Sequence, residues 1–392
     1  MTQPFDPRAP LPGPPEPWAG SDQPSARPGP PYHMTDMIAA EPHLARRLLE
    51  RLAEPDSGAA LLADEVRWAA TSGRAIVVTG CGTSEHGAQG LAEVLREALS
   101  ADARISAEQA FELALAPPSD GLVVGISHEG GTAATNRALE AAGVAGARTA
   151  LVTAAGDSPG AALAEIVVET GGLDQSWCHT VGYLSPLLVA ASVAGHLTSA
   201  HPAPDACAAL LTAGSADEAG AEAMAARLSD AAHLIVIGSG ADRVAGRELV
   251  LKVEEASWLP SAYRDLETFL HGHLPATGED TGLVLLLTDR RGRADRIARA
   301  RQALAAAAVL GIRSAAILAQ QAADAIPGEL TPAGRLIVPD APNLPAPVAS
   351  LLVTATALQL LTERLARARG TNPDPIRRDD PRFREASAAA EG

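Results

Sequence analysis

The feature that most constrains the fold is a pattern of strand-like runs and helices that occurs twice along the chain. Each copy opens with an apolar run ending in a glycine-rich turn, Gly-Cys-Gly in the first copy and Gly-Ser-Gly in the second. The matching segments begin at residues 76 and 234, 121 and 282, 148 and 313, and 186 and 347. Because the order is conserved and the offsets grow slowly, we interpret the pattern as a duplicated α/β unit.

The apolar runs indicate parallel sheets. In the first copy, strands are predicted at 75–79, 121–126, 149–153 and 165–169, with helices of ten to fifteen residues between them. Runs that are apolar on both faces are typical of a parallel sheet covered on both sides. We therefore predict two α/β domains with parallel sheets, one over 34–212 and the other over 213–370.

The two ends of the chain differ from this pattern. Residues 1–33 are dense in Pro, Gly, Ser and Asp, which predicts a disordered or loosely held arm. An amphipathic helix is expected from Met34 and another around 59–71. The segment 371–392 is predicted to be a tail that is mostly coil.

Composition excludes several classes of partner. The formal net charge of −16 disfavours nucleic acid and anionic membranes, and 3% aromatic residues leave little for stacking on bases. Three cysteines without paired or metal-ligand spacing fit a reducing cytoplasm, and we expect no metal and no cofactor. Neither a signal sequence nor a membrane span is indicated. The expectation is a cytoplasmic protein that handles a small molecule.

One lysine stands out among the 31 basic residues, because the other thirty are arginine. Lys252 lies in a predicted helix on one stripe with Glu248 and Glu255, and His271 follows sixteen residues after Glu255. A solvated helix face with a loop histidine accounts for these residues without any function. The alternative is a carboxylate base, an ammonium group that tunes it, and a histidine for a second proton transfer.

Two turns in the first copy have the composition of a ligand cradle. One contains Cys81, Gly82, Thr83 and Ser84, and the other contains Ser127, His128, Glu129 and Thr132. Small residues and hydroxyls at the carboxyl ends of parallel strands suit a bound anion. Ordinary tight strand-to-helix turns have the same composition. Neither turn has the P-loop lysine, and the first lacks the dinucleotide-binding glycine register.

Taken together, these stretches resemble the sugar isomerase (SIS) domain family. They are most similar to the isomerase half of glutamine–fructose-6-phosphate aminotransferase, the glucosamine-6-phosphate deaminases and the fructosamine deglycases. The two turns resemble C-G-T-S and S-Q-S-G-E-T, and residues 247–258 followed by His271-Gly272 resemble L-E-G-A-L-K-L-K-E-I-S-Y followed by H-G-P. The resemblance covers about residues 34–378. It implies two tandem SIS-type, three-layer αβα domains with flavodoxin-like parallel sheets.

The resemblance also implies residue roles. Glu255 matches the carboxylate that moves a proton between C1 and C2 of an open-chain sugar. His271 matches the histidine that opens the ring, which the other subunit of a homodimer usually supplies. Lys252 matches a lysine one turn before the carboxylate. Ser84, Ser127 and Thr132 match hydroxyls that hold the sugar's phosphate.

Three departures from the family pattern bear on the substrate. Glu129 replaces the second serine of the phosphate loop, and a carboxylate about 4 Å from a phosphate charge costs on the order of 4 kcal/mol at an effective dielectric near 20. Either Glu129 points away or a protonated His128 compensates. Val181 replaces a family lysine, and the tail lacks the lysine that enters the aminotransferase site.

These observations lead to one main hypothesis and two alternatives. The main one is a glutamine-independent isomerase or deaminase of a sugar phosphate, with an amino sugar phosphate such as glucosamine 6-phosphate as the first candidate. The second is an aldose–ketose isomerase or deglycase for a sugar whose anionic group is absent or placed differently. The third is a non-catalytic regulatory module that binds sugar phosphates. The Glu255, Lys252 and His271 constellation favours an enzyme.

Overall fold

The computed structural model describes residues 4–20 and 27–391. It contains two parallel five-stranded sheets, with strand orders β2-β1-β3-β4-β5 and β7-β6-β8-β9-β10. The second order repeats the first, strand for strand. The strands are β1 Ala75–Gly80, β2 Arg104–Gln109, β3 Leu122–Ile126, β4 Arg148–Thr153, β5 Ile166–Glu169, β6 His233–Gly238, β7 Ser261–Asp265, β8 Thr281–Leu287, β9 Arg313–Ala319 and β10 Gly334–Val338.

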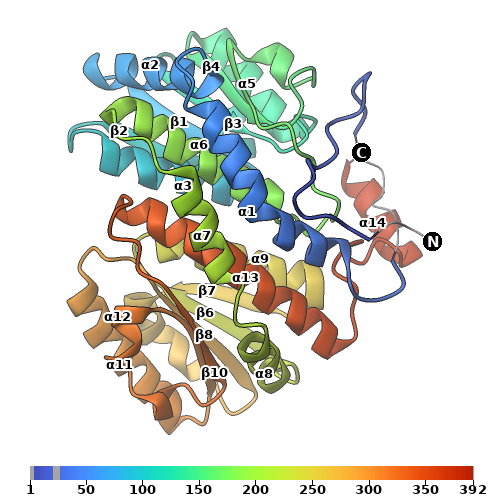
Figure 1. The fold of residues 1–392 in the computed structure, drawn as a ribbon, viewed down its shortest axis with the longest axis vertical. Coiled ribbons are helices and arrows are strands. Elements are labelled where there is room, and N and C mark those ends of the chain that lie inside the picture. Colours follow the sequence, from blue (N-terminus) through green and yellow to red (C-terminus); the bar gives the residue numbers. More distant parts are fainter. Residues whose placement is uncertain (1–3, 21–26, 392) are drawn as a thin grey trace.

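Helices cover both faces of each sheet, and a shared layer of helices lies between the sheets (Figure 1). Those of the first sheet and the chain leading to it are α1 His33–Leu52, α2 Gly58–Thr71, α3 Thr83–Ala98, α4 Ala110–Leu115, α5 Ala133–Ala145 and α6 Val181–Thr198. The remaining helices are α7 Pro204–Gly214, α8 Glu218–Leu228, α9 Asp242–Ser257, α10 Leu266–Thr268, α11 Arg293–Val309, α12 Gln320–Ala323, α13 Ala346–Arg369 and α14 Pro381–Glu391.

Alternation along the strands explains this layering. In β1, Ile76 and Val78 join the core between the sheets, whereas Val77 joins the outer core under α4 and α5. The second sheet repeats the arrangement, with its outer core under α11. Since side chains alternate between the two faces of a strand, a run that is apolar at every position needs cover on both sides.

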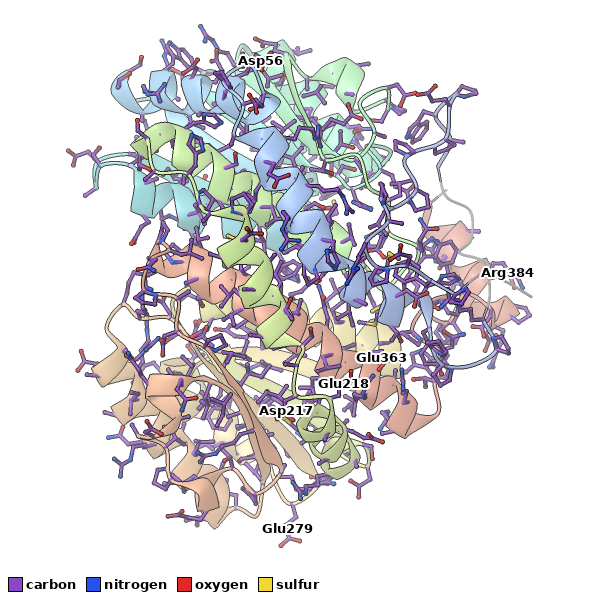
Figure 2. All side chains as sticks on the ribbon, in the orientation of Figure 1. Asp56, Asp217, Glu218, Glu279, Glu363 and Arg384 are labelled. Atoms are coloured by element: carbon purple, nitrogen blue, oxygen red, sulfur yellow. The ribbon has the colours of Figure 1, made fainter. Side chains whose placement is uncertain are left out.

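The helices between the sheets are tied together by charged groups as well as apolar packing. Arg364 of α13 pairs with Glu363 and with Glu218 of α8, where its Nη2 lies 2.7 Å from the Glu218 carboxylate. Figure 2 labels Glu218 and Glu363 in this region. Arg247 of α9 donates to the Gln89 side chain of α3 at 3.0 Å. Elements of both sheets therefore meet in one continuous core.

The predicted central strands are confirmed, but three edge strands were not predicted. These are β2, β7 and β10, each at the edge of its sheet. An edge strand has one neighbouring strand, and here β2 and β7 contain no fully buried residue. Their sequences, RISAEQ and SAYRD, therefore lack the apolar run that marks a central strand.

The expectations for the two ends of the chain need correction where the structure describes them. Part of the predicted arm, 21–26 and 1–3, lies outside the described residues. Residues 4–20 are not loosely held throughout: Leu11 is buried against Val181 and α1, and Pro12 accepts a backbone hydrogen bond from Leu173. In the tail, α14 replaces the predicted coil. One buried apolar residue such as Leu11 hardly changes the composition of a Pro-rich segment, so composition alone does not predict such contacts.

Two helices, α6 and α13, are long and apolar enough to cross a membrane by length and composition. The protein's own core buries most of α6 and all of the apolar stretch of α13. The core between the sheets therefore accounts for their composition.

The close packing of α3 on α6 depends on glycine. An ideal Cβ at Gly87 would lie 2.7 Å from Cγ of Pro186, whose ring cannot move aside easily. We expect Gly87→Ala to lower the free energy of unfolding by roughly 1 kcal/mol, because overpacking outweighs the gain in helix propensity. Gly143→Ala in α5 is the matched control, since its nearest neighbour would be 3.9 Å away. In thermal unfolding, this control should be as stable as wild type or more stable. If Gly87→Ala were as stable as Gly143→Ala, the packing argument would be wrong.

Candidate active site

A cleft of about 520 Å³ gathers most of the predicted site residues at the carboxyl edge of the first sheet. Seven of the eight predicted binding residues line it, and Glu255 of α9 contributes a catalytic candidate from the second half of the chain. The lining residues that were predicted are Cys81, Gly82, Thr83, Ser84, His128, Glu129, Thr132 and Glu255. The eighth binding candidate, Ser127, is buried and donates its hydroxyl hydrogen bond to Thr132 at 3.1 Å.

Glu255 and Lys252 form a tight ion pair on one face of α9. The Lys252 ammonium lies 2.6 Å from a Glu255 carboxylate oxygen, and Lys252 is completely buried, whereas the Glu255 side chain is 22% exposed. Burial alone would lower the pKa of Lys252, but the carboxylates of Glu255 and Glu248 raise it. Burial raises the pKa of Glu255, and Lys252 opposes this shift. The result is an oriented carboxylate at the cleft with a fixed counter-charge behind it.

Glu248 extends this pair to the first sheet. Its carboxylate lies 3.6 Å from the Lys252 ammonium, 2.6 Å from Nδ1 of His86 and 3.3 Å from the Thr83 hydroxyl. Burial would raise the pKa of Glu248, but Lys252 and the His86 hydrogen bond lower it overall. Helix α9 of the second sheet is therefore hydrogen-bonded directly to α3, whose first turn lines the cleft.

The two turns reach the cleft through different local conformations. Gly82 precedes α3 with φ 57° and ψ −126°, a combination that only glycine adopts without strain. In the second turn, the Gly130 backbone lies so close to Ser158 that a Cβ has no room. Both turns place the N-terminus of a helix, α3 or α5, at the cleft. Burial raises the pKa of the Cys81 thiol, so this side chain is a neutral thiol.

His128 does not compensate for Glu129 by carrying a proton. Burial and the neighbouring His179 lower the pKa of His128 to about 4, and its Nε2 accepts the backbone N–H of Asp174 at 2.9 Å. Burial and Lys252 lower the pKa of His179 to about 3. Both imidazoles are therefore neutral near pH 7. Glu129 is one of the residues that line the cleft, so an acidic residue lies at the cradle.

Two aromatic residues and an arginine in the cleft were not predicted. Trp18 of the arm donates its indole N–H to the Glu129 carbonyl at 2.9 Å and packs on Gly131. Arg378 of the tail stacks on Trp177 at 4.3 Å from the ring centroid. Trp18 is the lone tryptophan of the Pro-rich arm, which is the signal that sequence reasoning passed over. Arg378 lies in a segment that we expected to be mostly coil.

His271 does not reach the cleft of its own chain. Its side chain is 69% exposed on the second half of the molecule, and its Nε2 lies 2.6 Å from the Glu267 carboxylate. Glu267 is in turn held by Arg299 at 2.6 Å. The predicted histidine is thus available at the surface, separate from Glu255.

The corresponding position in the second sheet is filled by the chain's own carboxylates. At the start of α9, Asp289 accepts the Ala241 backbone N–H at 2.9 Å and pairs with Arg291 at 2.9 Å. Asp242 accepts the backbone N–H groups of Thr288 and Asp289 at 2.8 and 3.0 Å. The helix terminus that would attract an external anion is neutralised internally. In the first sheet, the corresponding turns line the cleft.

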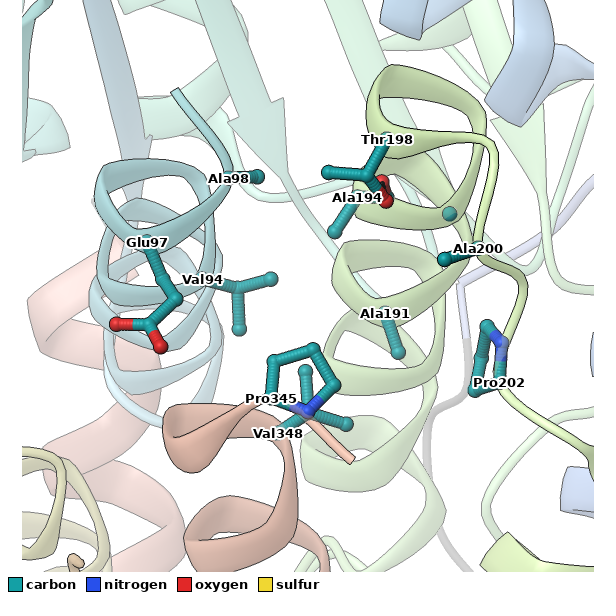
Figure 3. A pocket seen from close by; sticks show the side chains of 11 residues that line it. Val94, Glu97, Ala98, Ala191, Ala194, Thr198, Ala200, Pro202, Pro345 and Val348 are labelled. Carbon is teal, nitrogen blue, oxygen red and sulfur yellow. Dashed lines mark hydrogen bonds between the residues drawn. The ribbon is translucent and has the colours of Figure 1, made fainter. Parts of the chain in front are cut away.

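Other hollows lack the chemistry of the cleft. One of about 70 Å³ lies between α3, α6 and the start of α13 (Figure 3), and mainly alkyl groups line it. A groove of about 840 Å³ beside it is formed by residues 198–210 and 339–345, which are rich in alanine and proline. Neither contains a predicted site residue. Within the described ranges 4–20 and 27–391, no group of three or more His, Cys, Asp or Glu side chains is placed to hold a metal.

Comparisons with known proteins identify the fold. No protein-family profile matches the chain, and a search of curated proteins finds no match. Among solved structures, the C-terminal domain of glucosamine-fructose-6-phosphate aminotransferase from Francisella tularensis superposes with a TM-score of 0.76 at 18% identity, covering 89% of this chain and 99% of that chain.

Two other structures agree. Tagatose-6-phosphate ketose/aldose isomerase from Escherichia coli gives a TM-score of 0.66 at 17% identity, covering 91% of this chain and 98% of that chain. Glucosamine-6-phosphate deaminase from Thermotoga maritima gives 0.62 at 15% identity, covering 87% and 96%. The chain therefore has the sugar isomerase (SIS) fold.

The buried ion pair makes a pH-dependent prediction. Lys252→Met leaves Glu255 and Glu248 without their counter-charge, which should lower the free energy of unfolding by about 3–5 kcal/mol at pH 7.5. Without the ammonium, the pKa values of these two carboxyls are higher in the folded protein than in the unfolded chain. The folded variant therefore binds more protons than the unfolded variant, and lower pH stabilises it. The loss of unfolding free energy should thus shrink as the pH falls towards 5.

Urea unfolding of both proteins across this pH range measures the effect. Arg247→Met is the matched control, because Arg247 lies on the same helix and contacts Gln89 without contacting Glu255. It should cost less than about 1 kcal/mol at every pH. A loss in Lys252→Met that is constant with pH would contradict the assignment of Lys252 as the counter-charge.

Proposed function

We propose that this protein is a sugar-phosphate isomerase or deaminase that works without glutamine, on an amino sugar phosphate such as glucosamine 6-phosphate. The observation that carries the proposal is the Glu255 carboxylate, oriented by buried Lys252, facing a cleft with two hydroxyl-rich turns. The names of the similar structures support this class of chemistry: one is an isomerase of a ketose and aldose phosphate, and another a deaminase.

The proposed reaction is a proton transfer between adjacent carbons. After the ring opens, the Glu255 carboxylate removes the C2 proton of the aldehyde form and returns it to C1. With a hydroxyl at C2 the product is a ketose, by way of an enediol. With an amine at C2 the enolamine becomes a ketimine, which water hydrolyses to the ketose and ammonia. Because burial raises the pKa of Glu255, its carboxylate is a stronger base than an exposed one.

We further propose that His271 opens the sugar ring in the cleft of a second copy of the chain. Its exposure and its hydrogen bond to Glu267, which suits a proton-transfer group, support this role. The arrangement makes the protein a homodimer with shared active sites.

We assign the two SIS-type units to 34–212 and 213–370, since their strand orders repeat. The described cysteines are free thiols, which agrees with a cytoplasmic location.

Exchange at C2 tests the role of Glu255. In D₂O with glucosamine 6-phosphate and a panel of ketose and aldose phosphates, wild type should exchange the C2 proton. Glu255→Gln should lower the rate at least 10²-fold, because it removes the base. Glu254→Gln is the matched control: Glu254 is exposed and caps the Ser261 backbone N–H at 3.0 Å.

Proton NMR measures both rates, and ammonia release separates deamination from isomerisation. Exchange confined to unphosphorylated sugars would favour the second hypothesis, an isomerase or deglycase for a sugar without a phosphate. Absence of exchange together with ligand-induced thermal stabilisation would contradict the proposal and leave a binding module.

Mixing two inactive variants tests the shared site. Glu255→Gln and His271→Gln homodimers should each be inactive. After exchange of subunits, half of the dimers combine one chain of each kind, and one of their two sites has both residues intact. Activity should recover to roughly a quarter of wild type. Full activity of His271→Gln alone, or no recovery on mixing dimers that do exchange subunits, would contradict a histidine supplied by the partner.

A further inference from the structure

The charges that line the cleft are unevenly distributed. Among its described lining residues, Glu129 and Glu255 are acidic and Arg378 is the only cation. Lys252 is buried and already paired with Glu255, and the imidazoles of His128 and His179 are neutral near pH 7. An anionic group of a substrate therefore has one cationic side chain available to it in the cleft of the chain itself.

Arg378 has a geometry suited to an oxyanion. Its guanidinium carbon lies over the Trp177 ring, 4.3 Å from the ring centroid. Within the described ranges, its side chain makes no ion pair within 4.0 Å and no hydrogen bond to the protein. A guanidinium stacked in this way keeps its in-plane N–H groups for two parallel hydrogen bonds to phosphate oxygens.

The tail holds Arg378 in place before any ligand binds. The Asp374 carboxylate accepts the first backbone N–H groups of α1, from His33 at 2.8 Å and Met34 at 2.9 Å, and its carbonyl accepts the Trp177 N–H at 3.0 Å. The next turn carries Ile376 and Arg377 at φ 42° and 66°. Two consecutive left-handed residues other than glycine are unfavourable, and they persist where the surrounding contacts fix the chain.

The turn at 127–132 is a poorer place for the same anion. It contains the Glu129 carboxylate, and Trp18 packs on its backbone: the ring would lie 2.8 Å from a Cβ at Gly131, and the indole N–H is bonded to the Glu129 carbonyl at 2.9 Å. The arm thus covers part of the surface of this turn. Repulsion from Glu129 and attraction to Arg378 both favour an anion at the Trp177 end of the cleft.

We propose that Arg378 is the residue that binds the phosphate of the substrate, so that the phosphate lies at the Trp177 end of the cleft and away from the turn at 127–132. The inference deepens the proposed function, and it rests on that function for the identity of the site. It specifies a substrate with a phosphate group that reaches the tail while C1 and C2 lie at Glu255. Arg378 is therefore a specificity-determining residue.

Isothermal titration calorimetry of the full chain with inorganic phosphate tests the inference without catalysis. Wild type should bind phosphate, and Arg378→Gln should bind at least tenfold more weakly. Arg377→Gln is the matched control, because the neighbouring Arg377 stacks on Trp258 and Phe383 and does not line the cleft. Its affinity should equal that of wild type.

Two further variants keep the outcomes distinct. Arg378→Lys retains the charge but loses the paired hydrogen bonds, so its affinity should lie between wild type and Arg378→Gln. Glu255→Gln should bind phosphate at least as well as wild type, whatever its effect on exchange at C2. Failure of C2 exchange therefore tests the proposed function alone. No phosphate binding by wild type, or equal affinity of wild type and Arg378→Gln, would overturn the inference.

Discussion

The buried ammonium of Lys252 is the interaction on which the site depends. A lysine without exposure to water is stable only beside opposite charge, and here Glu255 and Glu248 supply it at 2.6 and 3.6 Å. Glu255 faces the cleft, and Glu248 is bonded to His86 and Thr83 of α3. One buried charge thus orients the proposed base and joins the second sheet's helix to the first sheet's turn.

The two halves repeat one topology but differ in their cradles. In the first, the turns end in small and hydroxyl residues and remain open to the cleft. In the second, Asp289 accepts the Ala241 backbone N–H and Asp242 accepts the Thr288 backbone N–H. The protein's own carboxylates thus occupy the corresponding position. The second half contributes its helix α9 and no open cradle of its own. This difference explains why, in the described part of the chain, the cleft combines the turns of the first sheet with Glu255 of α9.

Much of this arrangement was predictable from sequence, and the reasons for the rest are physical. Central strands such as β1 and β8 are buried on both faces, so their sequences are uniformly apolar and were recognised. The edge strands β2 and β7 bury less and resemble loops. The turns at Cys81–Ser84 and at 127–132 were recognised as candidate ligand-binding turns, because ligands bind beyond the carboxyl ends of parallel strands. Trp18 and Arg378 come from segments that were predicted to be loosely held or mostly coil, and tertiary contacts place them in the cleft.

We propose that the sugar binds in the cleft between the turns of the first sheet and Glu255 of α9. A crystal structure with an open-chain hexitol 6-phosphate, which cannot react, would locate the ligand. We expect the hydroxyl-bearing carbons at Glu255 and the phosphate at Arg378. A ligand in the groove formed by 198–210 and 339–345, or at the start of α9 beside Asp289, would contradict it.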